Sequence, residues 1–287
     1  MRVLVIGGTG TVGSQVVYAL LAREVVVRVL TRNADKAKGL PVGVEGVIGD
    51  LLDPATIRSV FKDIDSVFML LAVSTTETHE GLMAVNGMRM SGVKHIAYMS
   101  VHNLEQALHL PHFGSKLPVE AALKTSGIPY TILRPNNFFQ NDYWFRDAMI
   151  KNSIYPQPIG DVGLSRVDIR DIAEAAAVVV MTPGHEGRTY NLVGPDVHTG
   201  KSTAEAWGRA LGKTISYGGN NLEAWEQQSL QSLPAWMVFD FKLMYSFFQD
   251  KGLKASQSDI EHLTKLLGHP PRSFGDFAIE TARGWKT

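Results

Sequence analysis

Residues 1–14 read MRVLVIGGTGTVGS, and this stretch decides the fold class. Residues 2–6 form a short, mostly apolar run rich in β-branched side chains, which is typical of a buried strand. Glycines follow at positions 7, 8, 10 and 13, and a helix-compatible segment covers residues 15–21. Strand, tight glycine turn and helix are the parts that place a dinucleotide pyrophosphate at a helix N-terminus, because the free N–H groups and the helix dipole there favour negative charge.

The glycines match two related nucleotide-binding patterns. Gly8, Gly10 and Gly13 satisfy G-x-G-x-x-G, and Gly7 together with the last two satisfies G-x-x-G-x-x-G. Neither pattern is specific alone, but its place between a first strand and a helix predicts a dinucleotide-binding loop. The alternative is a glycine-rich turn in another α/β fold. The loop residues that we expect to contact the dinucleotide are Gly7, Thr9, Gly10, Thr11, Val12 and Gly13.

The end of the next strand-like run indicates which dinucleotide is bound. Residues 25–30 are mostly apolar and lead into Thr31, Arg32 and Asn33, about twenty residues past the glycines. An NAD site usually has Asp or Glu at this point to accept hydrogen bonds from the adenosine ribose. Arg32 instead offers a guanidinium that can grip a 2′-phosphate and stack on the adenine. NADP(H) is therefore favoured over NAD(H); the alternative is a solvated arginine at a strand end.

Composition excludes several classes of function. The chain has 287 residues, 45% of them hydrophobic, which is enough for one large domain or for one domain with an added lobe. Lys plus Arg equals Asp plus Glu at 28 each, so no net field attracts nucleic acid or an anionic membrane. The absence of cysteine excludes disulfides and zinc–sulfur sites. No apolar run has membrane-spanning length, and a strand starting at residue 2 leaves no room for a signal peptide, so we expect a cytoplasmic protein without membrane, nucleic-acid or metal partners.

Strand-like and helix-like segments alternate through the first half of the chain. This alternation predicts βαβ units, and hence an α/β fold with a doubly wound, parallel Rossmann-type sheet over residues 1–150. The expected strands cover residues 44–48, 66–73, 95–100 and 130–133, and the expected helices cover residues 53–61, 80–91 and 116–126.

The pattern changes after residue 150. A helix over 169–180 and a strand over 188–193 predict a segment, about 165–195, that returns to the sheet. Beyond residue 203 the chain reads as helices with many aromatic side chains, which predicts a smaller, mainly helical C-terminal lobe within 151–287 and a substrate cleft between the two parts. The nearly apolar stretch 235–249 is interpreted as packing, and the alternatives are a pocket wall or a homodimer contact.

Six motifs in order along about residues 1–180 carry a resemblance to a known family. They are GGTGTVG at 7–13, TRN at 31–33, GDLLD at 49–53, GVKHI at 92–96, LRPNNFF at 133–139 and VDIRDIA at 167–173. With them the chain resembles the NmrA-like branch of the atypical short-chain dehydrogenases/reductases. That branch includes NADPH-dependent quinone and triphenylmethane reductases, isoflavone-type reductases, and regulators that bind the cofactor without turning it over.

The resemblance implies roles for further residues. It implies that Asp50 and Leu51 border the adenine, that Lys116 hydrogen-bonds the nicotinamide ribose, and that Ser100 lies on the substrate side. Leu71, Ala72 and Val73 are expected under the ribose, which also follows from the rule that ligands bind beyond the carboxyl ends of parallel strands.

One departure from the wider superfamily affects catalysis. Typical short-chain dehydrogenases carry Tyr-x-x-x-Lys, whereas here His112 stands four residues before Lys116 and the tyrosine is missing. His112 replaces the tyrosine as proton donor, because imidazole titrates near neutrality, or it is an ordinary loop histidine. Hydride transfer to a conjugated acceptor does not strictly need an enzyme acid, because charge delocalises over the acceptor and solvent supplies the proton.

The sequence therefore predicts an NADPH-dependent reductase acting on a small, flat, apolar acceptor such as a quinone or enone. Phe138, Phe139 and Tyr143 are expected to line the substrate pocket, and Asn136 either contacts the nicotinamide or closes a turn. The main alternative is a redox-sensing regulator that binds NADP(H) and acts through a protein partner. A sugar-nucleotide epimerase or dehydratase is disfavoured, because those enzymes generally keep the tyrosine.

Overall fold

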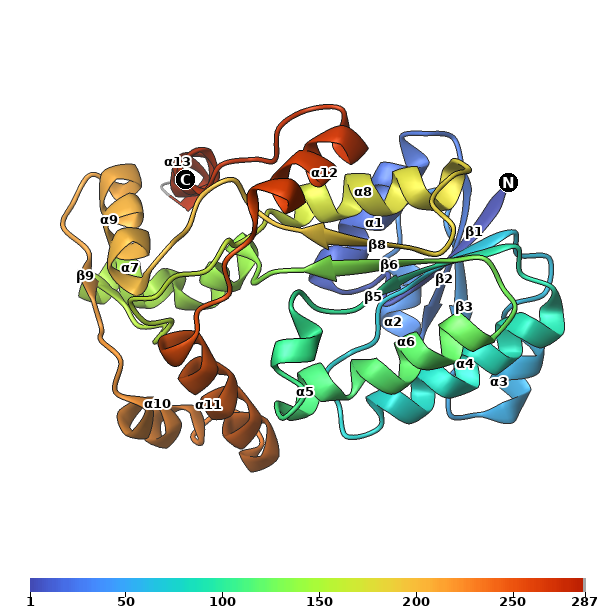
Figure 1. Ribbon diagram of the computed structural model, residues 1–287, viewed down its shortest axis with the longest axis horizontal. Helices are drawn as coiled ribbons and strands as arrows, with labels where there is room; N and C mark the ends of the chain where they lie inside the picture. The colour runs from blue at the N-terminus through green and yellow to red at the C-terminus, as the bar shows by residue number, and fades with distance from the viewer. Residues whose placement is uncertain (286–287) are drawn as a thin grey trace. The chain divides into compact units, whose positions relative to one another are not determined.

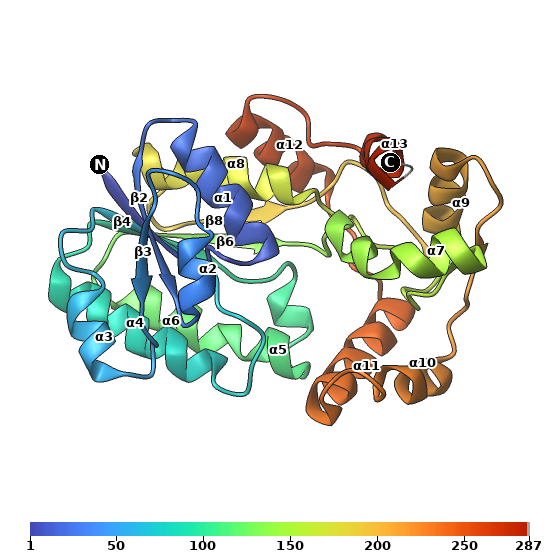
Figure 2. The ribbon, with the colours of Figure 1, turned by 180° about the vertical axis from the view of Figure 1, so that it is seen from behind.

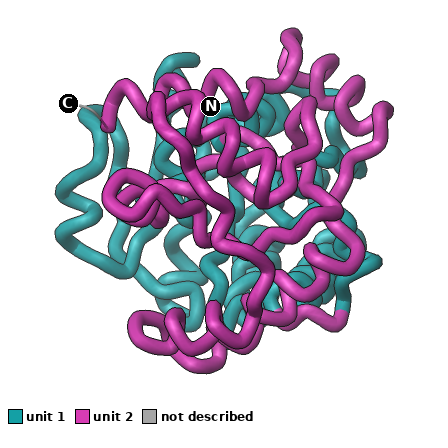
Figure 3. The backbone as a smooth tube through the Cα atoms, turned by 90° about the vertical axis from the view of Figure 1, so that its left-hand side faces the viewer, with its two compact units in different colours: residues 1–108, 112–135, 169–191 teal, residues 109–111, 136–168, 192–287 magenta. Residues whose placement is uncertain are grey.

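Segments that lie far apart in the sequence share one folding unit in the computed structural model, which describes residues 1–285. Unit 1 comprises residues 1–108, 112–135 and 169–191, and unit 2 comprises residues 109–111, 136–168 and 192 onward (Figure 3). The sequence predicts a division near residue 150 and a segment of about 165–195 that returns to the sheet. In the structure, residues 136–150 lie in unit 2, and residues 169–191 return to unit 1.

A seven-stranded sheet organises unit 1, with the strand order β3-β2-β1-β4-β5-β6-β8. Each neighbouring pair from β3 to β6 is parallel; in register, Val3 of β1 lies opposite Val27 of β2 and Ser66 of β4. This order and direction confirm the α/β doubly wound fold. The strands are β1 (Arg2–Ile6), β2 (Val26–Thr31), β3 (Glu45–Ile48), β4 (Ser66–Met69), β5 (His95–Met99), β6 (Tyr130–Pro135) and β8 (Arg188–Leu192).

Helices cover both faces of this sheet (Figures 1 and 2). On one face, α1 (Thr11–Leu21) packs along α8 (Ile169–Met181). On the other face, α4 (Glu77–Ser91) packs against both α3 (Pro54–Ser59) and α6 (Lys116–Thr125). Shorter helices occupy the connections; they are α2 (Ala34–Lys38), η1 (Leu104–Gln106) and α5 (Pro111–Gly114).

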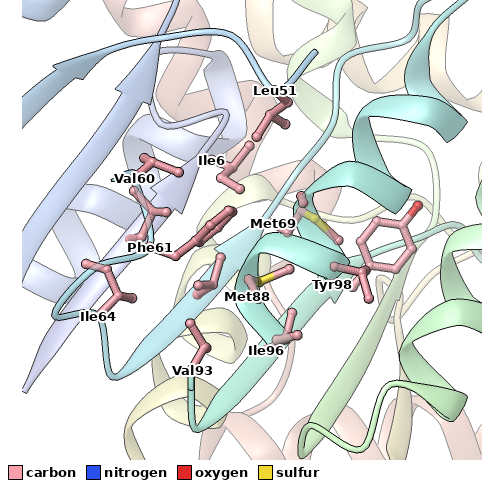
Figure 4. Close-up of a cluster of buried hydrophobic side chains, with 14 of the residues drawn as sticks. Ile6, Leu51, Val60, Phe61, Ile64, Met69, Met88, Val93, Ile96 and Tyr98 are labelled. Atoms are coloured by element: carbon pink, nitrogen blue, oxygen red, sulfur yellow. The ribbon is translucent and has the colours of Figure 1, made fainter. Parts of the chain in front are cut away.

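The core of unit 1 follows from strands that are covered on both faces. Every residue of β4 is buried, as expected for a continuous apolar run inside a parallel sheet. Between the sheet and α3 and α4 lies a large apolar cluster that includes Phe61, Met69 and Met88, each 0% exposed (Figure 4). Burying one such side chain contributes about 2 kcal/mol to the free energy of unfolding, so this cluster fixes the position of α4.

Unit 2 is mainly helical. Its short strands β7 (Ile154–Tyr155) and β9 (Ser216–Tyr217) pair in parallel, and α9 packs against α13. Trp207 of α9 is 0% exposed and stacks on Trp285 of α13 with ring centroids 4.8 Å apart. The remaining elements are η2 (Phe139–Phe145), α7 (Arg146–Asn152), α9 (Gly200–Leu211), α10 (Leu222–Ser229), α11 (Ala235–Asp250), α12 (Gln257–Leu267) and α13 (Phe274–Trp285).

Candidate cofactor site

The glycine loop joins β1 to α1 through a tight turn. Gly7 adopts φ +82°, a left-handed conformation that favours glycine, and its carbonyl oxygen accepts a hydrogen bond from the Gly10 N–H at 3.0 Å. The helix begins at Thr11, four residues earlier than the segment 15–21 that the sequence indicates. The loop therefore leads straight from the strand end into the helix N-terminus.

Close backbone contacts explain why particular loop positions are glycine. A Cβ atom on Gly13 would lie 2.1 Å from the Gly7 carbonyl oxygen, and one on Gly7 would lie 2.5 Å from the Leu70 carbonyl oxygen. A Cβ on Gly10 would lie 3.4 Å from the Gly7 oxygen, which is ordinary contact. Packing therefore requires glycine at positions 7 and 13. Gly10 is exposed, and with no side chain it leaves the N-terminus of α1 open to solvent.

The N-terminus of α1 has the properties of an anion site. In the described part of the chain, no side chain caps this end, and the first turn carries no acidic residue. The backbone N–H groups of the first turn, from Thr11 to Gly13, lack partners within the helix and lie at its positive end. The glycine cradle and the open helix end together fit a dinucleotide pyrophosphate.

Arg32 follows β2 directly and is the exposed cation at this edge of the sheet. Its side chain is 62% exposed, and its Nη1 lies 4.0 Å from Oε1 of Glu80. Glu80 is buried on the first turn of α4 and accepts a hydrogen bond from the Thr76 hydroxyl at 2.7 Å. Asn33 accepts from the N–H groups of Asp35 and Lys36, which caps α2 and turns the chain immediately after Arg32. Arg32 is thus held loosely enough to meet a 2′-phosphate.

The expected adenine and ribose positions lie at the same edge, because they follow the carboxyl ends of β3 and β4. Asp50 accepts a hydrogen bond from the Leu52 N–H at 2.9 Å, and Leu51 belongs to the buried core. The sequence predicts a strand over 66–73, but β4 ends at Met69 and residues 70–73 form a loop. Within that loop Leu71 is buried, Ala72 is exposed and Val73 is half-buried.

Lys116 is the first residue of α6, and it is ion-paired with Glu77, the first residue of α4. The Glu77 side chain is 0% exposed and that of Lys116 is 10% exposed. The Ser115 hydroxyl donates to the second Glu77 oxygen at 3.2 Å, and the Thr78 hydroxyl donates to the Ser115 carbonyl at 2.8 Å. Glu77 is a site residue that the sequence did not indicate, because no local pattern links positions 39 residues apart.

His112 and Lys116 stand on two different helices. His112 lies in α5, half-buried, with its ring edge-on to Phe113 at 4.8 Å between centroids. Pro118 explains the break, because a proline cannot donate to the carbonyl of Gly114 and its ring clashes with that carbonyl. Ser115 between them keeps helical dihedral angles, φ −58° and ψ −22°, so α6 follows α5 after a single turn residue.

Tyr98 does not substitute for the missing tyrosine. It is 0% exposed on β5, and Figure 4 shows it at the margin of the apolar cluster. Burial raises the pKa of its hydroxyl well above 10, and the Glu77 and Glu120 carboxylates raise that pKa further. A buried phenol of this kind does not donate a proton to a substrate near neutral pH. Ser100, just beyond β5, is also buried at 3% exposure.

The remaining predicted residues belong to unit 2. Asn136 is 2% exposed; its amide nitrogen donates to the Leu253 carbonyl at 2.7 Å and its oxygen accepts from the Asn137 N–H at 2.8 Å. Phe139 is 0% exposed and packs edge-on against Phe274 at 5.1 Å, so its ring lies in the core of unit 2 instead of lining an open pocket. Phe138 is half-buried, and Tyr143 is 44% exposed.

Two further features concern the residues that the structure describes. Within residues 1–285, no helix is both long enough and apolar enough to cross a lipid bilayer. The same residues bring together no cluster of three or more His, Asp or Glu side chains that could hold a metal ion. The candidate site is therefore built from backbone N–H groups, Arg32 and Lys116 at the carboxyl edge of the sheet.

This edge has the arrangement of the dinucleotide-binding α/β proteins. The chain belongs to the NmrA-like family, whose model matches residues 1–278. An NAD(P)H azoreductase from Xenophilus azovorans is 28% identical over 280 residues, 96% of each chain. Quinone oxidoreductase 2 from Escherichia coli is 27% identical over 289 residues, again 96% of each. The solved structure of triphenylmethane reductase from Citrobacter sp., complexed with NADP(H), has a TM-score of 0.85 at 25% identity and covers 98% of this chain and 99% of that one.

Proposed function

We propose that this protein is an NADPH-dependent reductase that transfers hydride to a small, apolar, conjugated acceptor such as a quinone or an enone. The observation that carries the proposal is the uncapped N-terminus of α1 with the exposed Arg32 at the end of the neighbouring strand. The relatives support the reductase class, since they are named as an azoreductase, a quinone oxidoreductase and a triphenylmethane reductase. The azo, quinone and triphenylmethane groups in these names differ, and what they share is conjugation.

Each part of the proposed site has one task. The N–H groups of the glycine loop bind the pyrophosphate, and Arg32 binds the 2′-phosphate that distinguishes NADPH from NADH. Lys116 binds the hydroxyls of the nicotinamide ribose with its ammonium protons. When bound, NADPH supplies the hydride. The protein contributes position and electrostatics, because holding two reactants in register removes much of the entropic part of the barrier.

The histidine at position 112, where typical short-chain dehydrogenases have the tyrosine four residues before the lysine, favours conjugated acceptors over simple ketones. Negative charge that arrives with the hydride delocalises over a quinone or enone, so a strong enzyme acid contributes little. His112 is the side chain that we assign to proton delivery, either directly or through water, because an imidazole can donate a proton from a ring nitrogen. Reversible alcohol oxidation needs a base that removes the hydroxyl proton, and it is disfavoured because the tyrosine that supplies this base in typical short-chain dehydrogenases is replaced by His112.

The test is oxidation of NADPH by a panel of quinones, enones, azo dyes and triphenylmethane dyes, followed by loss of the reduced-nicotinamide absorbance. We expect turnover with at least one acceptor class and a lower KM for NADPH than for NADH. The purified protein with NADH in place of NADPH is the matched control. Tight NADPH binding without oxidation by any acceptor would overturn the reductase assignment and would favour a cofactor-sensing role.

A further inference from the structure

We propose that Glu77 is a positioning residue, which aims the Lys116 ammonium at the nicotinamide ribose. The inference rests on the proposed function, because Lys116 has this task only if NADPH binds. Glu77 itself touches neither cofactor nor substrate in this role and acts through Lys116.

The contacts around Glu77 fix its carboxylate from two directions. One oxygen accepts from Lys116, and the other accepts from the Ser115 hydroxyl at 3.2 Å. The hydroxyl of Thr78, on the same turn of α4, donates a hydrogen bond to the Ser115 carbonyl at 2.8 Å. The start of α4 is thereby bonded three times to the corner where α6 begins, so the Lys116 side chain has little freedom to swing.

Helix electrostatics make Lys116 depend on this partner. Glu77 lies at the N-terminus of α4, where the helix dipole stabilises a carboxylate. Lys116 lies at the N-terminus of α6, where the dipole opposes a cation, and its side chain is only 10% exposed. A buried ammonium in an unfavourable dipole needs a nearby anion, and Glu77 supplies that anion.

The pairing leaves Lys116 able to bind a ligand. An ammonium carries three N–H donors and no acceptor, and the Glu77 contact uses one of them. The remaining two donors are directed by the position of the first, and they are the N–H groups that we assign to the ribose hydroxyls. Because the Glu77 carboxylate fixes the direction of one N–H group, it also fixes the directions of the other two N–H groups, to which the ribose hydroxyls would bind.

The neighbouring carboxylate on α4 provides an internal comparison. Glu80 lies three residues after Glu77 and pairs with Arg32, the cation that we assign to the 2′-phosphate. One helical turn therefore carries one buried carboxylate for each of the two cations. Loss of Glu77 should affect only the nicotinamide end of the cofactor, whereas loss of Glu80 should affect the adenosine end.

The decisive experiment measures two ligands on Glu77→Gln, namely NADPH and 2′,5′-ADP, which contains the adenosine 2′-phosphate but no nicotinamide ribose. We expect NADPH affinity to fall about tenfold, the effect of losing one charge-assisted hydrogen bond, with 2′,5′-ADP affinity unchanged. Glu80→Gln is the matched control and should weaken both ligands together. If Glu77→Gln lowered the affinity for both ligands equally, or for neither, Glu77 would have only a structural role and the proposal would be overturned.

A double-mutant cycle tests whether the effect passes through Lys116. In a Lys116→Met background, Glu77→Gln should change NADPH affinity and kcat no further, whereas independent effects would add. Ser115→Ala removes one contact to Glu77 and is the milder variant; we expect a smaller loss confined to NADPH, and thermal unfolding checks that each variant is folded. If the unmodified protein binds neither ligand, the proposed function itself fails, which is distinct from binding that is insensitive to Glu77.

Discussion

Asp142 and Arg166 form an ion pair in the interior of unit 2, with both side chains 0% exposed and Nη2 of the arginine 2.7 Å from Oδ1 of the aspartate. The Trp207 indole N–H donates to the same carboxylate at 2.8 Å, and the Tyr155 hydroxyl donates at 3.1 Å. The guanidinium also lies 5.1 Å from the centroid of the Phe274 ring. This network joins η2, β7, α9 and α13, so one buried ion pair links four of the elements of unit 2.

Removal of that carboxylate should destabilise the protein strongly. Asp142→Ala leaves the Arg166 charge buried without an anion, and the expected loss in the free energy of unfolding is about 3–5 kcal/mol, measured by urea denaturation. Asp147→Ala is the control, because its carboxylate is 61% exposed and pairs with Lys151 at the surface. An Asp142 variant as stable as the Asp147 variant would contradict the assigned role of the network.

Cofactor preference should depend on Arg32. Arg32→Glu replaces the proposed 2′-phosphate ligand with a repelling charge, so NADPH affinity should fall at least about tenfold while NADH affinity changes little. Fluorescence titration with the two reduced cofactors measures both values. Lys38→Glu makes the same charge change at the end of the neighbouring helix α2, at a side chain that is 79% exposed, and should leave the ratio of the two affinities unaltered. Equal losses for NADPH and NADH in Arg32→Glu would refute the 2′-phosphate role.

Alanine should be tolerated at Gly39, which ends α2, but not at Gly13 of the glycine loop. In Gly13→Ala the new methyl group would lie 2.1 Å from the Gly7 oxygen, so the loop must shift, with an expected cost of about 1–3 kcal/mol and loss of NADPH binding. Gly39→Ala is the control, because its methyl group would lie 3.6 Å from the nearest atom, the Asp35 oxygen. Its stability and NADPH affinity should match those of the unmodified protein, and normal NADPH binding by Gly13→Ala would exclude the tight loop.

His198 should make stability depend on pH. Burial, together with the nearby Arg166 charge, lowers the pKa of His198 from 6.5 to about 4. Because the unfolded chain then binds the proton more readily, stability is fully present above about pH 6.5 and is lost as the pH falls towards 4. From neutral pH to about pH 5 this histidine alone should remove about 2 kcal/mol from the free energy of unfolding.

Comparison of two variants isolates this contribution. His198→Phe keeps the ring that packs 4.8 Å from Phe274 but cannot be protonated, so its urea midpoint should fall less between neutral and acidic pH. His79→Gln, at an exposed position, should retain the pH dependence of the unmodified protein. Parallel curves for His198→Phe and the unmodified protein would contradict the assignment.

Proton delivery by His112 has a kinetic signature. His112→Phe should lower kcat and leave NADPH affinity nearly unchanged, since the side chain is assigned to the acceptor and not to the cofactor. The loss should be larger for enones than for quinones, whose reduced forms delocalise charge better. An unchanged kcat with every acceptor would remove His112 from the mechanism.

The strength of each sequence pattern determined how well it predicted the fold. The sequence predicts strand β1 at its observed bounds, and the helix expected from residue 53 begins where Asp53 caps α3 by accepting from the Ala55 and Thr56 N–H groups. The end of β4 was placed four residues too late, because an apolar run continues whether the backbone stays in the sheet or leaves it. The strand in fact ends at Met69, after which the Leu70 N–H donates to the Ile6 carbonyl.

The candidate site was less accessible to sequence reasoning where roles depend on distant partners. The glycine spacing predicts the loop because the constraint is local, between Gly7 and Gly13. Glu77 carries no such signal, since its partner is 39 residues away and a glutamate early in a helix is common. Phe139 does carry a sequence signal, but an ambiguous one. An aromatic residue after a strand end is equally compatible with a pocket wall and with the buried contact to Phe274 that the structure shows.

Because the segments of the two units alternate along the sequence, a fragment or a chimera with a relative cannot be made by cutting the chain at one position. A fragment ending at residue 150 would lack α8, leaving the apolar face of α1 without its partner, and it would also carry residues 136–150 without the rest of unit 2. A chimera that exchanges only the C-terminal half with a relative would therefore replace part of both units at once. Exchange of unit 2 as a whole requires three grafted segments, 109–111, 136–168 and 192 onward, with residues 112–135 and 169–191 kept from the parent.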